Sequence, residues 1–434
     1  MARLHQSAWR ILPFTRRQVR DLVHNHVPGQ LVIQLTDRCN GLCPQCGMRA
    51  TEHFSRSSMA VDDVKRVIDA AVARGFTVLS FTGGEPLLLL DELVSLIQYA
   101  GSAGMEYIRT GTNGFLFAGS ERPDFESRMA RLADTLAAVP LRNLWISIDS
   151  AEAKVHETMR GFPGVIEGIR KALPIFHERG LYPTANLGIN RNIGGRSEGN
   201  PTVSPGSGGT ISARDFYNHY RASFRRFFEL VVGLGFTLVN TCYPMSMAEN
   251  ENSGELGAVY AAESADPVVS FSPEEKALLF EALLDTIPEY RSRVRIFSPR
   301  SSLYALAGDH RDIRTVSYPC RGGIDFFFID ARAADAYPCG YRGRENLGKF
   351  WSLNGAHDAA PADCTLCDWE CFRDPSFLLG PLLALSTHPM QLARSVYAHR
   401  PFYRLWLEDL RYYHSCDFFD GRKPPDYARL SRFA

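Results

Sequence analysis

Apolar strands and amphipathic helices alternate along residues 31–300 of the chain. Short apolar runs typical of buried strands occur at 31–36, 76–82, 107–112, 143–149, 183–190 and 236–243. Apolar residues recur at helical spacing in 61–72, 91–103, 126–138, 165–179, 212–234 and 273–287. Six strand–helix units in this order predict an α/β fold with a parallel sheet and crossover helices. This pattern leaves open whether the sheet is doubly wound or curls into a partial barrel.

The segments outside these units have other patterns. Residues 1–30 mix arginines with scattered apolar positions and predict one amphipathic helix with a solvated basic face. Two stretches without periodicity, 191–211 and 246–270, are expected to be long loops, and the first is either a lid or specificity element or a plain insertion. Residues 376–434 are dense in aromatics and arginines and predict helices that pack on the core. The same interleaving could also stack on nucleobases.

Charge and targeting signals exclude several classes of partner. Lysine plus arginine equals aspartate plus glutamate at 48 each, so no net field favours nucleic acid or an anionic membrane. The first residues lack the uninterrupted apolar stretch of a signal peptide, and the longest apolar run, 377–385, is too short to span a bilayer. We therefore expect a soluble, cytoplasmic protein with no nucleic-acid or membrane partner. In that compartment its ten cysteines are more compatible with thiolate ligands than with disulfides, and eight of them fall in two groups.

Three cysteines directly follow the first predicted strand. Cys39, Cys43 and Cys46 have C-x3-C-x2-C spacing, so their thiolates can converge on one metal centre. A closed structural site takes four protein ligands, whereas three thiolates on a 4Fe–4S cluster leave one iron open to a small molecule. Taken alone, the triplet is also compatible with a fragment of a ferredoxin-like or zinc site. Cys242 and Cys416 stand apart from the other cysteines and are expected to be buried, inert thiols.

Glycine-rich and polar motifs end the second, third and fourth predicted strands. Residues 81–87 read Phe-Thr-Gly-Gly-Glu-Pro-Leu, in which paired glycines permit close backbone approach and a carboxylate can orient an ammonium group. A glycine turn before a helix-starting proline explains the same residues. Thr-Asn-Gly at 112–114 and Ser-Ile-Asp at 147–149 are further candidates, although turns and strand-end caps use the same residue types. Arg160 beyond them offers a guanidinium fork suited to a carboxylate.

The cysteine triplet followed by Gly-Gly-Glu-Pro resembles the radical S-adenosylmethionine (SAM) enzymes. In that family a 4Fe–4S cluster binds SAM and cleaves it to a 5′-deoxyadenosyl radical, which abstracts a substrate hydrogen. The resemblance favours a partial (β/α)6 TIM-like barrel. It also implies a set of SAM-binding residues, with Asn186 as a further polar candidate: Gly83, Gly84, Glu85, Pro86, Asn113, Ser147, Asp149, Arg160 and Asn190. One departure is Gln45, because the family usually has an aromatic residue there, beside the adenine.

A second group of cysteines follows the predicted core. Cys320 and Cys339 flank two short predicted strands, and Cys364, Cys367 and Cys371 follow in C-x2-C-x3-C spacing. This order resembles the twitch or SPASM extensions of radical SAM enzymes. The cysteines are too few for two fully ligated clusters, so the resemblance implies one auxiliary 4Fe–4S cluster on the first four, with Cys371 as a spare or substitute ligand. A four-cysteine zinc site is the alternative.

We therefore expect an N-terminal helix at 1–30, a radical SAM core at 31–300, a cysteine-rich auxiliary cluster domain at 315–375 and a helical tail at 376–434. The resemblance implies an oxidoreductase-type radical SAM enzyme that oxidises, dehydrogenates or epimerises a small metabolite. Its electrons would come from a one-electron donor such as flavodoxin or ferredoxin. Modification of a ribosomally synthesised peptide is the alternative substrate class, and a non-enzymatic iron–sulfur carrier or sensor is the alternative of another kind. No catalytic side chain is assigned.

Overall fold

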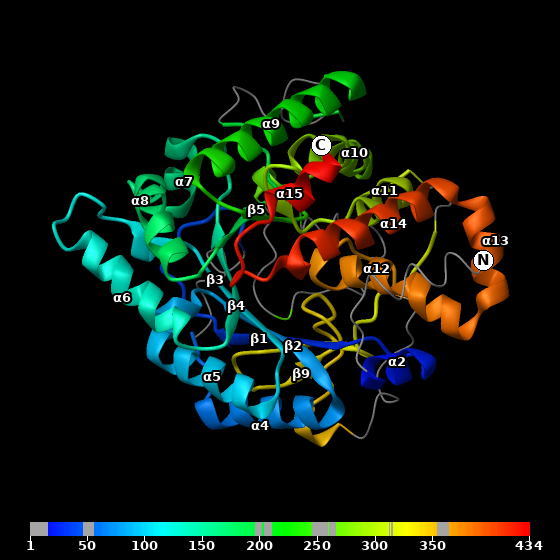
Figure 1. Ribbon diagram of the computed structural model, residues 1–434, viewed down its shortest axis with the longest axis horizontal. Coiled ribbons are helices and arrows are strands. Elements are labelled where there is room, and N and C mark those ends of the chain that lie inside the picture. The colour runs from blue at the N-terminus through cyan, green and yellow to red at the C-terminus, as the bar shows by residue number, and fades with distance from the viewer. Residues whose placement is uncertain are drawn as a thin grey trace.

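One curved, mostly parallel sheet forms the centre of the protein (Figure 1). The computed structural model describes residues 16–46, 56–195, 202–203, 211–244, 259, 266–311, 313, 316–353 and 364–434. Its strands are β1 (Gly29–Thr36), β2 (Phe76–Gly83), β3 (Tyr107–Thr112), β4 (Leu141–Ser147), β5 (Thr184–Gly188), β6 (Leu238–Cys242), β7 (Arg295–Ile296), β8 (Phe326–Ile329) and β9 (Ala336–Tyr337). They lie in the order β7-β6-β5-β4-β3-β2-β1-β8-β9, and only the β8–β9 pair is antiparallel. The sheet does not close, so the predicted partial barrel is confirmed.

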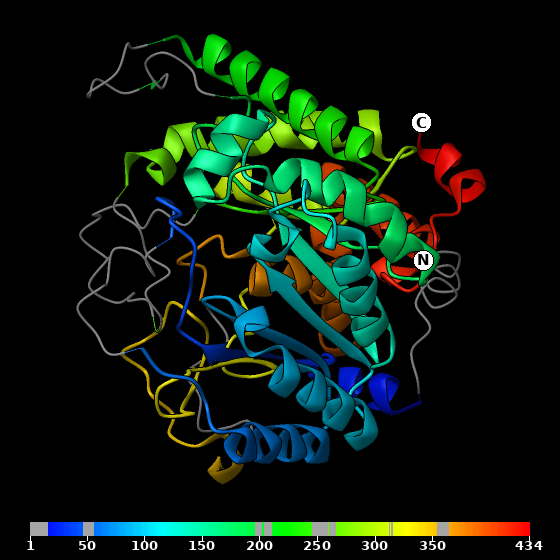
Figure 2. The same cartoon turned by 90° about the vertical axis from the view of Figure 1, so that its left-hand side faces the viewer.

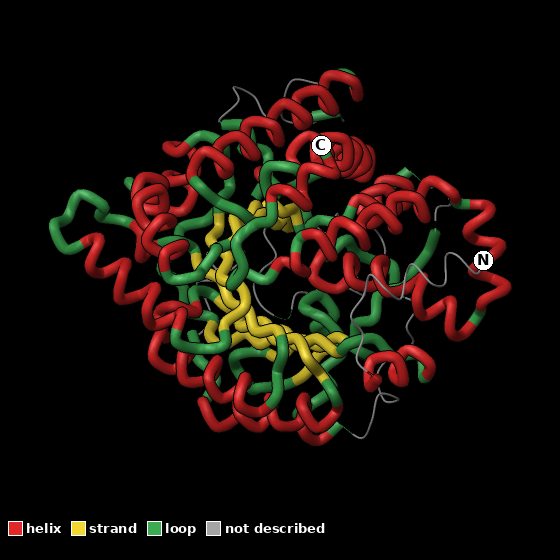
Figure 3. The backbone as a smooth tube through the Cα atoms, in the orientation of Figure 1, coloured by secondary structure: helices red, strands yellow, loops and turns green. Residues whose placement is uncertain are grey.

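The helices that follow the strands cover the outside of this sheet. They are α4 (Val61–Arg74), α5 (Leu90–Ala103), α6 (Phe125–Ala137), α7 (Ala153–Arg160), α8 (Val165–Glu178), α9 (Ala213–Leu234), α10 (Pro273–Tyr290) and α11 (Arg300–Asp309). In α4 the apolar stripe Val64, Val67, Ile68 and Ala71 is fully buried, and Gly75 ends the helix with φ 88°. Figure 3 shows the strands as one arc with helices outside it, and Figure 2 shows blue α4 and green α9 on opposite sides of the molecule.

The sheet contains β7, a strand that the hydrophobic pattern did not predict, and β8, the first of the two short strands predicted between Cys320 and Cys339. β7 adds a short seventh parallel strand beside β6. β8, from the cysteine-rich segment, pairs in parallel with β1, so that residues 326–329 lie opposite residues 30–33. All eight residues of β1 are consequently buried, because this strand has neighbours on both edges. The pairing places the C-terminal cysteines beside the strand that leads into Cys39.

The C-terminal tail covers the open side of the barrel. It contains α12 (Glu370–Thr387), α13 (Pro389–Ala398), α14 (Arg400–Ser415) and α15 (Tyr427–Leu430). In Figure 1, orange α12 and red α14 lie across the gap between the sheet edges. The Tyr412 hydroxyl accepts a hydrogen bond from Ile296 N of β7 at 2.9 Å, and Tyr243 OH donates to Asp374 of α12 at 3.1 Å. The predicted packing of a helical tail on the core is therefore confirmed, and α12 runs through the expected domain boundary at 375/376.

The segment after α14 closes the amino-terminal end of the barrel. Asp417 to Phe419 form a short 3-10 helix, η6, in which all three residues have positive φ angles of 51°, 51° and 59°. Tyr107 OH donates to Phe419 O at 3.0 Å, and Gly421 N donates to Arg142 O at 2.8 Å. These bonds to β3 and β4 hold an unfavourable left-handed backbone in place. The tail therefore forms the floor of the barrel interior.

Some expected elements are only partly described. Of the helix expected at 1–30, the structure describes α2 (Arg16–Val23), and residues 1–15 lie outside the described part. Most of the two expected loops, 196–201 and 204–210 in the first and 246–258 and 260–265 in the second, also lie outside it. Within the described residues, no helix is both long enough and apolar enough to cross a bilayer.

Candidate functional site

The loop after β1 brings its three cysteines together. Cys43 is buried, Cys46 is half-buried and Cys39 is exposed. A methyl group placed on Gly41 would lie 3.4 Å from Cys43 Sγ and 3.6 Å from Cys39 Sγ, so both sulfurs border the same point. Burial, with smaller contributions from the neighbouring Cys46 and Cys39, raises the pKa of the Cys43 thiol to about 12. The donor set is thus three thiols on one short loop, which suits an iron–sulfur cluster with one open iron.

The two glycines after β2 hold this loop against the sheet. Gly83 has φ 151°, and a Cβ there would lie 2.2 Å from Thr36 O. A Cβ on Gly84 would lie 2.1 Å from Arg38 O. The backbone bonds Gly84 N to Thr36 O and Glu85 N to Arg38 O, both 2.8 Å, join the same segments. The glycines therefore permit close approach to the cysteine loop, and their predicted contact with a ligand stays a prediction.

Glu85 is fully buried at the junction of β2 and β3. Its Oε1 accepts from Leu87 N at 3.0 Å, and its Oε2 accepts from Asn113 N at 2.6 Å. Burial raises the pKa of this carboxyl to about 7. Asn113 in turn donates to Asn40 Oδ1 at 2.8 Å and approaches Cys39 Sγ at 3.7 Å. Glu85 thus supports the cysteine loop through backbone amides. Its predicted contact with an ammonium group stays a prediction. The predicted ligand contact of Pro86, which is buried beside it, also stays a prediction.

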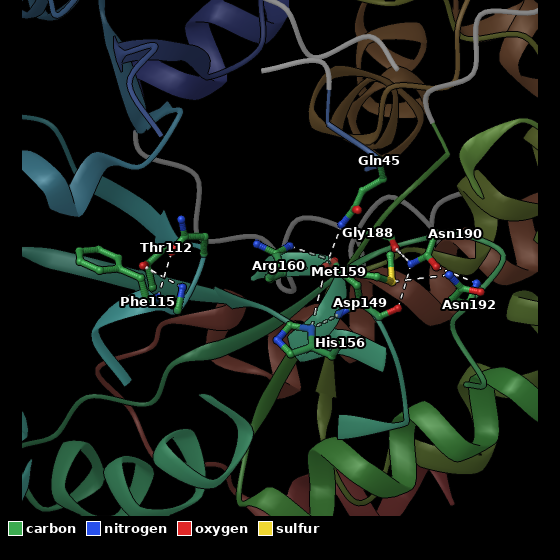
Figure 4. A network of polar contacts seen from close by, with 12 residues as sticks. Gln45, Thr112, Phe115, Asp149, His156, Met159, Arg160, Gly188, Asn190 and Asn192 are labelled. Carbon is green, nitrogen blue, oxygen red and sulfur yellow. Dashed lines mark hydrogen bonds and ion pairs between the residues drawn. The ribbon is translucent and has the colours of Figure 1, made fainter. Parts of the chain in front are cut away.

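A buried ion pair lies beside the cysteine loop (Figure 4). Arg160, the last residue of α7, donates from Nε and Nη2 to the two oxygens of Asp149 at 2.7 and 2.9 Å. Burial alone would raise the pKa of Asp149, but Arg160 lowers it below its usual value. His156 Nδ1 accepts from Asp149 N at 3.1 Å, and burial lowers the pKa of this histidine to about 4. Arg160 is predicted to bind a carboxylate of SAM, and in this structure the carboxylate of Asp149 binds the same guanidinium.

Gln45 joins this pair to the interior of the barrel. Its Nε2 donates to Asp149 Oδ2 at 2.8 Å. Its Oε1 is buried and has no hydrogen-bond partner among the described residues. A buried carbonyl oxygen without a donor is costly, and a ligand N–H at this position would satisfy it. The residue that departs from the family pattern is therefore placed to contact a ligand.

The remaining predicted residues lie at the carboxyl ends of β4 and β5. Asn190 is fully buried and donates to Asp149 O and Gly188 O at 2.8 and 2.7 Å, so it ties the two strand ends together. Ser147 is half-buried and lies opposite Asn186 in the parallel register. Their proposed contacts with SAM stay predictions.

The interior of the barrel contains a cavity of about 290 Å³. Residues of several strands line it, including Arg109 of β3 and Asn186 of β5, together with Gln45 from the cysteine loop and Phe419 from the floor. Residues that the sequence reasoning left without a role also line it: Arg109, Asn143, Asn240, Cys242, Tyr341 and Glu370. Arg109 could have been found from the sequence, since a charged residue within a predicted buried strand has to face a polar interior.

Four C-terminal cysteines lie together at the outer edge of the sheet. Cys320 N donates to Cys364 O at 2.9 Å. Burial raises the pKa of Cys339 to about 12, and Cys320 and Cys364 beside it contribute. Burial likewise raises the pKa of Cys367, and Cys339 and Cys320 beside it contribute. These are the four residues expected to hold the auxiliary cluster.

The sulfurs of both groups share a backbone arrangement. Gly41 N, Gly322 N and Tyr341 N each donate to the cysteine two residues earlier at 3.4 Å. Such N–H···S bonds are typical of iron–sulfur sites, where they tune the sulfur ligands. Among the described residues, no three His, Cys, Asp or Glu side chains meet the geometry of a single-ion site, so both ligand sets stay predictions.

Cys371 lies away from the other C-terminal cysteines. It lines the barrel cavity with Cys242, and its Sγ approaches Glu370 Oε1 at 3.6 Å. Cys242, expected to be an inert buried thiol, also keeps part of its surface accessible within the cavity. Cys371, predicted as a spare cluster ligand, and Cys242, which stands apart in the sequence, thus line the same cavity inside the barrel.

Comparison with known proteins identifies the region that carries the first site. Residues 33–192 match the model of the Radical SAM superfamily, and this region contains all the residues predicted to bind SAM and the first cluster. The AdoMet-dependent heme synthase of Methanosarcina barkeri (strain Fusaro / DSM 804) is 23% identical over 316 residues, which cover 73% of this chain and 78% of that protein. The PqqA peptide cyclase of Rhodopseudomonas palustris (strain ATCC BAA-98 / CGA009) is 29% identical over 138 residues, 32% and 33% of the two chains.

A solved structure shares the fold. The crystal structure of Streptococcus suis SuiB bound to precursor peptide SuiA superposes with a TM-score of 0.50 and 14% sequence identity, covering 81% of this chain and 69% of that one. At this identity the likeness concerns the fold alone.

Proposed function

Since the chain belongs to the radical SAM superfamily, we propose that it uses SAM to oxidise, dehydrogenate or epimerise a small molecule held in the barrel cavity. When bound, SAM and the 4Fe–4S cluster supply the chemistry of the family, a carbon radical that abstracts hydrogen from unactivated C–H bonds. The observation that carries the proposal is the position of Gln45, which contacts the Asp149–Arg160 pair and lines the cavity next to Cys46.

Different residues of the first site would hold the cluster and SAM. Cys39, Cys43 and Cys46 would bind the cluster, and the Gly83–Gly84 backbone keeps their loop against the sheet. The free Gln45 Oε1 suits an N–H donor such as the exocyclic amine of adenine. Asp149 fixes Arg160 and Gln45 at once, so the guanidinium and the amide are oriented before a ligand binds.

The cavity supports a small, polar substrate. Its volume of about 290 Å³ lies near the lower end of the range of about 300–1,000 Å³ for small-molecule sites. Asn143, Asn186 and Asn240 offer amides, and the Arg109 guanidinium donates from Nε to Ser80 Oγ within it. The tail closes the floor, so substrate would enter from the carboxyl ends of the strands. The heme synthase relative, by its name, also produces a small molecule, which supports this substrate class.

The C-terminal cysteines would serve electron transfer or substrate binding. We propose that one auxiliary 4Fe–4S cluster is held by Cys320, Cys339, Cys364 and Cys367. The alternative is a zinc ion on the same four cysteines, and a metal assay distinguishes the two. A flavodoxin or ferredoxin would supply single electrons in the cytoplasm. If the substrate is instead a ribosomally synthesised peptide, a short segment of that peptide would enter the cavity.

Anaerobic reconstitution followed by addition of SAM and dithionite tests the function. We expect 5′-deoxyadenosine from the wild-type protein and none from Cys43→Ser, with iron and sulfide but no zinc at the auxiliary site. A non-enzymatic carrier or sensor would bind iron and sulfide but would not cleave SAM. Absence of 5′-deoxyadenosine from a fully iron-loaded protein would therefore overturn the proposal.

A further inference from the structure

We propose that Cys242 and Cys371 form a hydrogen-atom donor inside the barrel, which returns a hydrogen atom to the substrate radical. The inference rests on the proposed function and deepens it. Among the reactions proposed above, a hydrogen-atom donor favours those that make a new C–H bond, such as epimerisation, and disfavours net dehydrogenation.

The two thiols come from distant parts of the chain and share one cavity. Cys242 ends β6, and Cys371 is the second residue of α12, which covers the open side of the barrel. Both keep part of their surface accessible, although their neighbours Thr241, Tyr243 and Phe372 are buried. Since both residues line the cavity that Gln45 also lines, their accessible surface faces the space next to the predicted SAM site.

Polar groups orient both thiols. Cys242 Sγ donates to Asn186 Oδ1 at 3.4 Å, and that oxygen also accepts from Asn240 Nδ2 at 2.7 Å. Cys371 Sγ donates to Glu370 Oε1 at 3.6 Å. The second oxygen of Glu370 is buried and has no hydrogen-bond partner among the described residues. A buried carboxyl therefore lies beside both thiols, and one of its oxygens lacks a conventional hydrogen bond.

The environment keeps both sulfurs protonated. Burial raises the pKa of Cys242 and of Cys371 well above the ordinary value, and nearby Glu370 raises both further. A thiol in this state is a poor nucleophile, because nucleophilic attack needs the thiolate. It retains the S–H bond that hydrogen-atom transfer requires.

The transfer balances with one external electron. The S–H bond breaks homolytically and a C–H bond forms at the substrate carbon, which is favourable because an S–H bond is weaker than an aliphatic C–H bond. The sulfur is left as a thiyl radical. One electron from a reduced iron–sulfur or flavin protein, and one proton, restore the thiol. Glu370 is the nearest titratable group through which that proton can pass.

The resting protein provides the first test, without any turnover. The S–H stretching bands of the anaerobic protein are followed by infrared spectroscopy after transfer to D₂O and are assigned with the variants Cys242→Ala, Cys371→Ala and Cys416→Ala. We expect the bands of Cys242 and Cys371 to shift to S–D faster than that of Cys416, which is fully buried and does not line the cavity. If Cys242 and Cys371 show no S–H band, or exchange as slowly as Cys416, they are not protonated thiols open to the cavity and the proposal is overturned.

The second test follows deuterium from the thiols. In D₂O the S–H positions exchange, so SAM cleavage without substrate gives 5′-deoxyadenosine carrying one deuterium taken from sulfur. We expect this label to be lost in the double variant Cys242→Ala/Cys371→Ala and to persist in Cys416→Ala. Unchanged labelling in the double variant would refute the donor while leaving SAM cleavage established. Complete absence of 5′-deoxyadenosine from the wild type would instead refute the proposed function itself.

Discussion

Replacement of Gly84 by alanine probes the contact that carries the first site. The new Cβ would lie 2.1 Å from Arg38 O and 2.9 Å from Cys39 Cβ. Restoring an ordinary separation of 3.4 Å requires the Arg38 carbonyl to move by about 1.3 Å, given the 2.1 Å starting distance. Because Arg38 is bonded directly to Cys39, this movement displaces one of the three sulfurs.

The cost can be worked from the contacts that the movement breaks. The two backbone hydrogen bonds that join residues 84 and 85 to Thr36 and Arg38 contribute about 1 kcal/mol each. Overpacking at the same place costs about 1–3 kcal/mol. We therefore expect the free energy of unfolding of the metal-free Gly84→Ala protein to fall by about 3–5 kcal/mol, measured by urea denaturation.

The iron content separates this local effect from general damage. After anaerobic reconstitution, Gly84→Ala should bind about half of the wild-type iron, because Gly84 contacts the loop of Cys39 and none of its closest contacts is a C-terminal cysteine. It should form no 5′-deoxyadenosine. Gly233→Ala is the matched control, since nothing lies within 4 Å of its Cβ on the exposed face of α9. That variant should be unchanged or more stable by up to about 1 kcal/mol. Full iron content and SAM cleavage in Gly84→Ala would refute the reasoning.

Three further predictions concern other parts of the site. Cys371→Ser should keep the wild-type iron content whereas Cys364→Ser should lose the auxiliary iron, and equal losses in an iron assay would return Cys371 to the ligand set. Asp149→Asn should lower the unfolding free energy by about 3–5 kcal/mol in urea titrations, because it leaves Arg160 buried without its counter-charge; a change below about 1 kcal/mol would contradict the buried pair. Burial lowers the pKa of His156 to about 4 from the usual 6.5 of a histidine, so the unfolded chain binds its proton first as the pH falls. The metal-free protein should therefore lose up to about 3 kcal/mol between pH 6.5 and 4 relative to His156→Gln, and parallel stability–pH curves for the two proteins would exclude this.

Much of the fold followed from local pattern. The six strand–helix units lie where the hydrophobic periodicity predicted them, because period-two and helical spacings report which face of each element is buried. The spacing of Cys39, Cys43 and Cys46 placed three thiols on one loop, because all three lie within eight consecutive residues directly after a predicted strand. The Gly-Gly-Glu-Pro motif likewise marked the end of β2, because it directly follows the apolar run of that strand. These features depend on neighbours in the sequence and could be found there.

Long-range pairing decided the rest. Gln45 meets Asp149 although they are 104 positions apart, and β8 joins β1 across nearly 300 residues. The same packing of α12 on the open barrel removed Cys371 from the C-terminal cysteines and set it beside Cys242. The spacing of residues in the sequence could not predict these contacts. The entropic cost of closing a long loop rises only slowly with its length, so the length of chain between two residues does not decide whether they meet. Burial and strand pairing decide it instead. The order of residues thus specified the elements and the metal-binding loop, whereas packing between distant elements specified which side chains face the cavity.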